Sequence, residues 1–406
     1  VGIIGLGGRG TAHLRSYLSL PNAAITGLCD VNQAAREVAQ GTLSKAERPK
    51  AAEFEDMRKM FDDKNVDAVS IATPNHWHAL SAIWAAQAGK DVYVEKPASH
   101  NIFEGHQMVA AARKYKRMMQ VGSQSRSTPL KMEAMKLLQE GVIGKVYLAK
   151  ALCFKRRKSI GVTPAEPVPP GVNWDIFLGP APMRPFTKNR FKYNWHWFWD
   201  TGNGDIGNQG VHEMDIARWG LGLPDNRHEG LKSIYCTGGK FAYVDDQETP
   251  NTQLATFDYG DKQIVFEVRG ILTNGESGMT GKGNVVGNLF LGSEGVLEVE
   301  DSYYRVYKGE DRAVVMEKKR ERGSGDTTAL HMANFLAAVK SRDYKSINAE
   351  IEIGANSAAL CHMANIAYRT GRQLRWDVAK EQFIGDSEAN KMLTRDYRRP
   401  YVVEKI

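Results

Sequence analysis

Two segments that lie far apart in the sequence carry polar side chains able to move protons. The first is Glu95-Lys96-Pro97, which follows a short apolar run, and the second is residues 195–215, WHWFWDTGNGDIGNQGVHEMD, which contain His212. A lysine ammonium can donate to an oxygen that gains negative charge, and an imidazole exchanges protons near neutral pH. We therefore expect Lys96 and His212 to form an acid/base pair. The alternatives are a buried structural histidine and a surface lysine.

Two further polar residues flank His212. Asn208 lies four residues before it, and an asparagine amide can orient a partner by hydrogen bonding but supplies no charge. Asp215 lies three residues after His212, on the same side of a helical turn, and Asp205 lies in the preceding loop. We expect Asn208 to position the substrate and Asp215 to support catalysis. A polar contact on the side of the helix is an equal alternative for Asp215.

The chain opens with a glycine pattern that follows an apolar strand. Gly5, Gly7 and Gly10 form GxGxxG, and Asp30 follows twenty residues later at the end of the next predicted strand. Such glycines let the backbone approach a pyrophosphate at the positive end of a helix. A carboxylate at Asp30 can bind both ribose hydroxyls and would repel a 2′-phosphate, so the expected cofactor is NAD, with NADP less favoured. The expected contacts in this loop are Gly5, Leu6, Gly7, Gly8, Arg9 and Gly10.

Further cofactor contacts are expected where other strands end. In open α/β sheets the carboxyl ends of the strands at the switch point line the ligand site. The run TPNHWH at 73–78 follows a predicted strand at 68–72, and Gln124 follows one at 118–121. For His76 and His78 a capping or packing role is an equal alternative. The expected contacts are Thr73, Pro74, Asn75, His76, His78, Glu95, Lys96 and Gln124.

Aromatic residues before His212 suit a carbohydrate. Trp195, His196 and Trp197 precede the glycine-rich run, and Arg126 lies just after a predicted strand. Aromatic faces with polar edges can stack on the C–H faces of a pyranose, so these four residues are the expected substrate contacts. Core packing is the alternative for any single tryptophan, and we expect at least one of Trp195, Trp197 and Trp199 to be core.

The pattern of elements that must position these residues is that of an α/β protein in two domains. In residues 1–125 short apolar runs alternate with helical patterns, which is typical of βαβ units around a parallel sheet. From 230 to 307 successive strands with glycine-rich turns indicate a large, mostly antiparallel open sheet. We therefore predict a Rossmann doubly wound parallel sheet at 1–125 and a C-terminal α+β domain for substrate binding and oligomerisation at 126–406.

The predicted elements have the following bounds. Strands are expected at 1–4, 24–29, 68–72, 91–94, 118–121 and 146–154, and helices at 10–19, 33–40, 57–61, 79–88, 102–114, 130–139, 328–340 and 351–370. Residues 159–200, rich in Pro, Gly and Trp, are expected to form a long ordered connection that carries function. The terminal helices are expected to pack back on the first domain.

Composition favours a globular protein with a small-molecule ligand. The net charge of +7 is spread along the chain, so no nucleic-acid partner is expected, and no apolar run approaches the length of a membrane span. The four cysteines, Cys29, Cys153, Cys236 and Cys361, form no CxxC pair, so we expect buried thiols and no metal site.

The ordered series of motifs resembles the glucose-fructose oxidoreductase / inositol dehydrogenase family, often called Gfo/Idh/MocA. It comprises GxGxxG, TPNHxH, the EKP at 95–97, the entry to the second domain at 144–146, WDIFLGPAP at 174–182, the glycine-rich run before His212 and the terminal Gly371-Arg372. The resemblance implies that Lys96 lies beside nicotinamide and substrate, often across a cis Lys–Pro bond, and that Trp174 lies near the cofactor. This chain has Asn208 where many relatives have aspartate.

The resemblance also implies the reaction. The expected activity is hydride transfer between NAD(P) and a secondary hydroxyl of a sugar, polyol or glycoside. The alternatives are an NAD-dependent glycoside hydrolase or lyase that acts through a transient 3-keto intermediate, and a non-catalytic NAD-binding sensor. A homodimer or homotetramer through the C-terminal sheet is expected.

Localisation is inferred from the beginning of the sequence. The chain begins at Val1 within an apolar strand, and relatives of this subtype often carry an export signal, so a periplasmic location after its removal is favoured over a cytoplasmic one.

Overall fold

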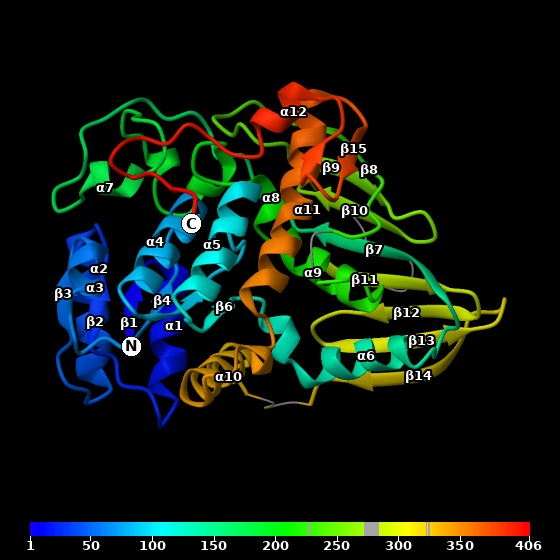
Figure 1. Ribbon diagram of the computed structural model, residues 1–406, viewed down its shortest axis with the longest axis horizontal. Helices are drawn as coiled ribbons and strands as arrows, with labels where there is room; N and C mark the ends of the chain where they lie inside the picture. The colour runs from blue at the N-terminus through cyan, green and yellow to red at the C-terminus, as the bar shows by residue number, and fades with distance from the viewer. Residues whose placement is uncertain (226–227, 272–283, 322, 324) are drawn as a thin grey trace.

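The computed structural model describes residues 1–225, 228–271, 284–321, 323 and 325–406, and contains two β-sheets with helices packed between and around them (Figure 1). The first sheet is six-stranded and parallel, in the order β3-β2-β1-β4-β5-β6. The order reverses direction between β1 and β4, which is the switch point of a doubly wound sheet. The predicted Rossmann architecture is therefore confirmed. Its strands are β1 (Gly2–Ile4), β2 (Gly27–Cys29), β3 (Ala52–Phe54), β4 (Ala68–Ile71), β5 (Asp91–Val94) and β6 (Met119–Val121).

The first domain differs from the prediction mainly in one strand, one helix start and one helix end, since the helix predicted at 33–40 continues to Lys45. Strand β3 was not predicted, because its three residues are exposed or half-buried and show no apolar run. Helix α4 starts at Asn75, four residues before the predicted start, so the predicted loop at 75–78 forms its first turn. The helices of this unit are α1 (Gly8–Leu18), α2 (Gln33–Lys45), α3 (Met57–Phe61), α4 (Asn75–Gln87) and α5 (Ile102–Lys114).

The second sheet has ten strands in the order β14-β13-β12-β11-β7-β10-β9-β8-β15-β16. Every paired neighbour is antiparallel except β7 and β10, so the predicted mostly antiparallel sheet is confirmed. The part of that prediction at 272–283 lies outside the described residues. The strands are β7 (Val146–Phe154), β8 (Ser233–Gly239), β9 (Thr252–Asp258), β10 (Gln263–Arg269), β11 (Val285–Gly292), β12 (Gly295–Val299), β13 (Tyr303–Lys308), β14 (Ala313–Lys319), β15 (Leu374–Asp377) and β16 (Gln382–Phe383).

Helices cover the inner face of this sheet and join it to the first domain. Helix α9 (Gly210–Gly220) packs closely, since a Cβ on Gly210 would lie 2.5 Å from Phe266 of β10 and one on Gly220 would lie 2.2 Å from Phe290 of β11. Helix α11 (Ile351–Thr370) contacts α5 of the first domain and β8 and α9 of the second, and runs between the two sheets in Figure 1. The helix that carries His212 therefore lies between the second sheet and α11.

Helix α10 (Thr327–Ser341) belongs to the core of the first domain. Its Met332 and Phe335 share a buried cluster with Leu14 and Tyr17 of α1. The remaining helical segments are α6 (Pro129–Gln139), α7 (Trp174–Leu178), α8 (Gly204–Gly207), α12 (Ser387–Lys391) and the 3₁₀ turns η1 (Gln124–Ser127), η2 (Lys188–Arg190), η3 (Asn194–Trp197) and η4 (Tyr344–Ser346).

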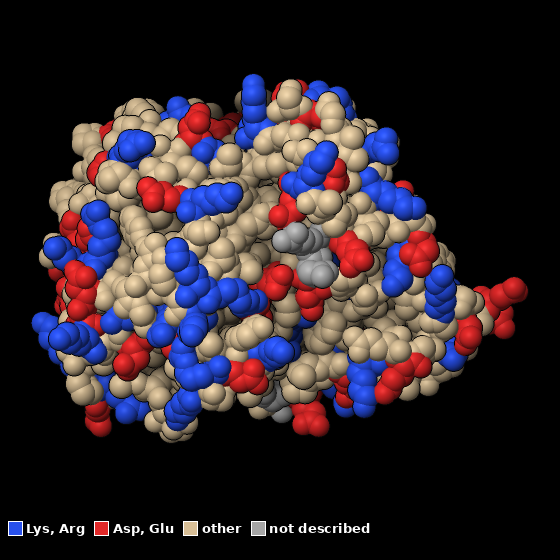
Figure 2. Space-filling view, in the orientation of Figure 1, with Lys and Arg blue, Asp and Glu red and all other residues tan. Residues whose placement is uncertain are grey.

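The distribution of surface charge and the state of the cysteines agree with what the composition indicated. On the face in Figure 2, cations and carboxylates are interspersed, with one stripe of Lys and Arg near the middle. All four cysteines are free and buried, as predicted. In the described part of the chain no helix is both long and apolar enough to cross a membrane.

Candidate active site

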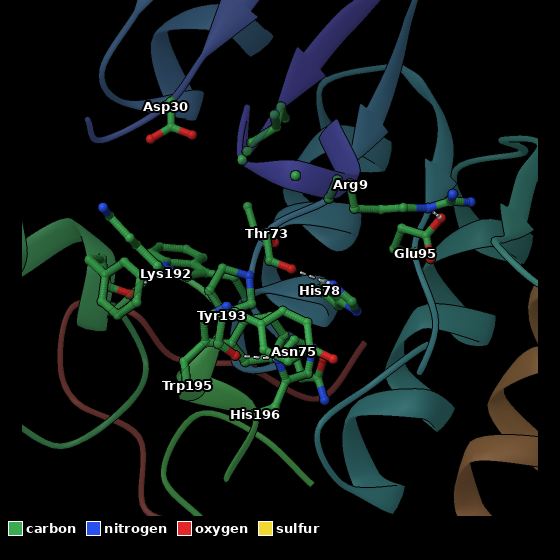
Figure 3. A pocket seen from close by; sticks show the side chains of 18 of the residues that line it. Arg9, Asp30, Thr73, Asn75, His78, Glu95, Lys192, Tyr193, Trp195 and His196 are labelled. Carbon is green, nitrogen blue, oxygen red and sulfur yellow. Dashed lines mark hydrogen bonds and ion pairs between the residues drawn. The ribbon is translucent and has the colours of Figure 1, made fainter. Parts of the chain in front are cut away.

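A cavity of about 970 Å³ lies where the two domains meet. Figure 3 shows Asp30 on one side of it, Trp195 and His196 on the opposite side, and Thr73, Asn75 and His78 between them. The first domain contributes the loops after all six strands of its sheet, and the second contributes residues between 155 and 212. The carboxyl ends of the parallel strands therefore form one wall of the cavity, where open α/β sheets bind ligands.

The glycine loop after β1 has the geometry of a pyrophosphate cradle. Gly5 has a φ of +82°, and a Cβ on Gly10 would lie 1.7 Å from the Gly5 carbonyl oxygen, so the turn requires glycine at both positions. A Cβ on Gly7 or Gly8 would meet no atom within 4 Å, and both residues line the cavity. Because α1 begins at Gly8, its amide groups and positive end face this open space. The loop fits a dinucleotide phosphate.

Asp30 ties the glycine loop to the end of β2. Its Oδ2 accepts from the Leu6 amide at 2.6 Å and its Oδ1 from the Asn32 amide at 2.8 Å. Burial raises the pKa of Asp30, and the two amide donors oppose that shift. The carboxylate still lines the cavity and each oxygen has further acceptor capacity. Asp30 therefore fits the ribose of NAD, while Leu6 serves through its main chain.

Glu95 organises the side chains at the far end of the glycine loop. It is buried, and its Oε1 accepts from Arg9 Nε at 2.7 Å, lies 2.9 Å from His13 Nε2 and accepts from Gln124 Nε2 at 3.0 Å. Burial alone would raise the pKa of Glu95, but the charge of Arg9 and the hydrogen bond from His13 hold it well below its ordinary value. Glu95 therefore positions Arg9 and Gln124, which line the cavity. His13 was not singled out from the sequence.

Lys96 lies against Asn208, the residue that was expected to position the substrate. Its Nζ donates to the Asn208 carbonyl oxygen at 3.0 Å and to Oδ1 at 3.2 Å, and the Lys96–Pro97 bond is cis, as the resemblance implied. Asn208 Nδ2 in turn donates to the Tyr193 hydroxyl at 3.2 Å. Burial lowers the pKa of Lys96, and the charge of Glu95 opposes that change. The ammonium is thus held by neutral acceptors inside the cavity.

His212 lines the same cavity one turn along the chain from Asn208. Burial, followed by the charge of Lys96, lowers the pKa of His212 to about 3. The imidazole is therefore neutral at physiological pH and can accept a proton or a hydrogen bond. Lys96, Asn208 and His212 thus all contribute polar groups to the same cavity.

Sequence comparison decides the family. Residues 1–123 match a family described as an oxidoreductase family with an NAD-binding Rossmann fold, and residues 130–230 and 299–403 match the C-terminal alpha/beta domain of the same oxidoreductases. The chain belongs to the Gfo/Idh/MocA oxidoreductase family. Its first domain is therefore an NAD-binding domain, in agreement with the glycine loop and Asp30.

Curated relatives of this Gfo/Idh/MocA protein include both oxidoreductases and glycosidases. The uncharacterized oxidoreductase YrbE of Bacillus subtilis is 25% identical over 66% of each chain. A glycosyl hydrolase family 109 protein of Saccharopolyspora erythraea is 33% identical over 36% of this chain and 33% of its own length. An alpha-N-acetylgalactosaminidase of Shewanella oneidensis is 26% identical over 37% of this chain and 34% of its own length. The match thus spans about a third of these glycosidases.

Solved structures of similar fold include sugar dehydrogenases. The WlbA dehydrogenase from Bordetella pertussis, in complex with NADH and UDP-GlcNAcA, has a TM-score of 0.69 at 20% identity and covers 93% of this chain and 98% of its own. Levoglucosan dehydrogenase, in complex with NADH and levoglucosan, has a TM-score of 0.69 at 18% identity, with 92% and 98% covered. At these identities the likeness shows the fold.

Two predicted site residues of this family member lie outside the cavity. Arg126 donates to Asp215 through Nε at 2.8 Å and Nη2 at 3.0 Å, and Asp215 also accepts from Ser357 Oγ of α11 at 2.7 Å. Neither residue is among those that line the cavity, because the bidentate pair satisfies both charged groups in the core. The expected substrate contact by Arg126 and the expected catalytic support by Asp215 therefore stay predictions.

Three predicted aromatic contacts support the wall from behind. His76 is hydrogen-bonded to the Phe177 carbonyl oxygen at 2.9 Å, and Trp174 stacks on Phe177 and donates to the Arg184 carbonyl oxygen at 2.8 Å. Trp197 is 3% exposed and is the core tryptophan that we expected. None of these three lines the cavity, so direct ligand contact by His76, Trp174 and Trp197 is not supported. Their polar atoms and ring faces are already used in contacts with the protein itself.

Apart from Leu6 and Gly10, the other predicted residues line the cavity, although several are held by protein partners. His78 binds the carbonyl oxygens of Pro97 at 2.7 Å and Thr73 at 2.8 Å through its two ring nitrogens, and Asn75 Nδ2 donates to Asn203 Oδ1 at 2.8 Å. Trp195 and His196 stack on each other with ring centroids 3.5 Å apart. The lining residues among those predicted are Gly5, Gly7, Gly8, Arg9, Asp30, Thr73, Pro74, Asn75, His78, Glu95, Lys96, Gln124, Trp195, His196, Asn208 and His212.

Several lining residues of the second domain were not found from the sequence. Tyr193 and Arg157 continue the chain of hydrogen bonds from Lys96 and Asn208, since Arg157 Nη1 donates to the Tyr193 hydroxyl at 3.0 Å. Lys155 and Gln209 also line the cavity. The cluster of basic residues at 155–158 was visible in the sequence, but only the fold shows that two of its members face the site.

Proposed function

We propose that the protein is an NAD-dependent oxidoreductase that transfers a hydride between the nicotinamide and a secondary hydroxyl of a sugar, polyol or glycoside. The observation that carries the proposal is the position of Lys96 Nζ, within 3.0 and 3.2 Å of Asn208 in the cavity that begins at the glycine loop and exposes His212. The proposal is also supported by the shared fold of two dehydrogenases whose structures contain NADH and a sugar or sugar nucleotide.

The cofactor site is built from the first domain. The Gly7–Gly8 backbone and the start of α1 would hold the pyrophosphate, and Asp30 would hold a ribose. NAD, when bound, accepts or supplies the hydride at C4 of its nicotinamide ring. The protein's part of the chemistry is to orient the hydroxyl-bearing carbon and to manage the proton on its oxygen.

Lys96 and His212 divide that proton handling. In oxidation the Lys96 ammonium donates a hydrogen bond to the hydroxyl oxygen and stabilises its developing negative charge. The neutral His212 accepts the hydroxyl proton as the C–O bond becomes a carbonyl, and returns it in reduction. Asn208 and Tyr193 orient Lys96 and the substrate by hydrogen bonds and carry no charge in this step.

The test is to denature the purified protein, assay any released nucleotide, and offer the native protein NAD and a panel of sugars and glycosides while NADH absorbance is followed. We expect one sugar class to produce NADH, and Lys96→Met to lower kcat by about 100-fold or more. Lys136→Met is the matched control, because Lys136 is an exposed lysine on α6. Binding of NAD and sugar without any turnover would contradict the proposal and indicate a sensor.

The glycosidase relatives favour one second candidate function. In this alternative a glycoside is oxidised transiently at C3, the aglycone is eliminated, water adds, and the hydride is returned, so the net reaction is hydrolysis. The support is the 33% identity to a glycosyl hydrolase family 109 protein over 151 residues. Release of the aglycone with tightly bound nucleotide and no accumulated NADH would select this candidate over the dehydrogenase.

A further inference from the structure

The charged residues that line the cavity are divided between the two domains. Among the described residues, every lining carboxylate belongs to the first domain, namely Asp30, Glu55 and Glu95. The second domain contributes Lys155, Arg157 and Lys192 to the lining, and within the described ranges it contributes no Asp or Glu. The part of the cavity that the second domain forms is therefore cationic.

Lys155 and Arg157 lie directly beside the residues proposed to carry the chemistry. They follow β7 at alternate positions, and alternate residues of an extended chain project to the same side. Lys155 Nζ donates to Gln209 Oε1 at 3.0 Å, next in sequence to Asn208. Arg157 donates to the Asp205 carboxylate at 2.7 and 2.9 Å and to the Tyr193 hydroxyl at 3.0 Å. Both side chains thus reach the α8–α9 segment, on which Asn208 and His212 are carried.

Among the described residues, no carboxylate forms an ion pair with Lys155. Asp205 neutralises Arg157, whereas the recorded partner of Lys155 is the uncharged amide of Gln209. Gln209 Nε2 in turn donates to Glu213 at 3.4 Å, but burial raises the pKa of Glu213 to about 8, so this acid is largely protonated at neutral pH. Lys192, at the rim beside Tyr193, also forms no ion pair within the described part of the chain. Within the described ranges, the part of the cavity formed by the second domain therefore carries two positive charges, those of Lys155 and Lys192, that are not paired with a carboxylate.

We infer that the substrate is a carbohydrate that carries a carboxylate, such as a hexuronate, and that Lys155 binds this carboxylate. The inference rests on the proposed oxidation of a sugar hydroxyl and deepens it. The half-buried Lys155 ammonium carries a single positive charge beside an amide oxygen, which suits a singly charged anion, and the Tyr193 hydroxyl accepts a hydrogen bond from the neighbouring Arg157 guanidinium. Lys155 is not needed for the cofactor pyrophosphate, because the glycine loop would bind it. Its hydrogen bond to Gln209, the residue after Asn208, instead places Lys155 near the residues proposed to carry out the chemistry.

The test uses matched pairs of sugars with the NAD-loaded protein. Glucose and glucuronate, and galactose and galacturonate, differ only at C6, and the uronate methyl esters keep the shape but remove the charge. Glucose 6-phosphate tests a different anion. Turnover is followed by NADH absorbance and binding by the fluorescence of bound NADH. We expect kcat/KM for a uronate to exceed that for its neutral partner and its ester by about tenfold or more.

Lys155→Gln removes the charge and keeps a hydrogen-bonding side chain. In this variant we expect the ratio of kcat/KM between acid and neutral sugar to fall about tenfold, mostly through KM, with the Kd for NAD unchanged. Lys136→Gln on α6 is the matched surface control. An unchanged ratio in Lys155→Gln would contradict the role of Lys155, and a parallel loss of NAD affinity would assign this lysine to the cofactor instead.

The outcomes separate this inference from the proposed function. If neutral sugars or methyl esters are oxidised as well as the acids, or if the sugar phosphate is preferred, the carboxylate assignment is overturned and the dehydrogenase proposal stands. If the protein binds NAD but neither oxidises nor binds any member of the pairs, the inference fails, and if the wider panel of sugars, polyols and glycosides also gives no turnover, the proposed function fails with it.

Discussion

At the level of single residues, the protonation of His212 depends on burial first and on the charge of Lys96 second. Lys96→Met removes that charge and leaves the burial in place. The pKa of His212 is then expected to rise from about 3 toward its ordinary value without reaching it, so the ring protonates at a higher pH. The measurement is an NMR titration of protein with ¹³C-labelled histidine rings, in which His212→Gln identifies the signal.

The control for this titration is Lys136→Met, which removes a lysine that pairs with Glu140 on the surface of α6. It is expected to leave every histidine signal of the wild type in place. If the His212 signal titrates identically in wild type and Lys96→Met, the two side chains are not electrically coupled, and their assignment as one acid/base pair is incorrect.

At the level of elements, the loop between β1 and α1 needs glycine for two different reasons, the fold of the turn at Gly10 and the space for the cofactor at Gly7. A Cβ on Gly10 would lie 1.7 Å from the Gly5 carbonyl oxygen, whereas one on Gly7 would meet no protein atom and would project into the cavity. We expect Gly10→Ala to lower the melting temperature and abolish NAD binding. Gly7→Ala is expected to keep the melting temperature and weaken NAD binding about tenfold or more, because the methyl group occupies the space of the pyrophosphate.

Differential scanning fluorimetry and NAD titration of the two variants distinguish these effects. Gly41→Ala in α2 is a suitable control, since a Cβ there also meets no atom within 4 Å and Gly41 does not line the cavity. Unimpaired NAD binding by Gly7→Ala would mean that the cofactor does not pass over this loop.

The sequence predicted elements well where burial leaves a pattern and poorly where it does not. Strands β4 and β5 are fully buried and were predicted within a residue, whereas β3 and β14, which are largely exposed, were missed. The motifs predicted Lys96, Asn208 and His212 in one cavity. They did not predict that Arg126 pairs with Asp215, because the sequence records charges but not which opposite charge lies nearest in the fold.

At the level of the whole molecule, the cavity has walls from both domains, and several segments hold the domains together. The C-terminal tail returns to the first domain, where Tyr401 packs on Trp77 of α4, and its Arg398 donates to Asp175 at 2.6 Å in the connection that forms the other wall. Helix α11 also contacts both domains. The C-terminal tail, the connection that contains Asp175 and α11 therefore together hold the two walls of the cavity in place. Changes far from the cavity in sequence can therefore alter it.

The outer face of the ten-stranded sheet is where we predict self-association. Tyr235 of β8 and Leu254 of β9 are 45% and 43% exposed, while their neighbours in each strand are buried in the core. An open sheet face with exposed apolar side chains is stabilised when a second copy covers it. We expect a dimer or tetramer by size-exclusion chromatography with light scattering, and a shift toward the monomer in Leu254→Lys. Val38→Lys on α2, where the side chain is 64% exposed, should leave the mass unchanged, and a wild type that is monomeric across a concentration series would contradict the prediction.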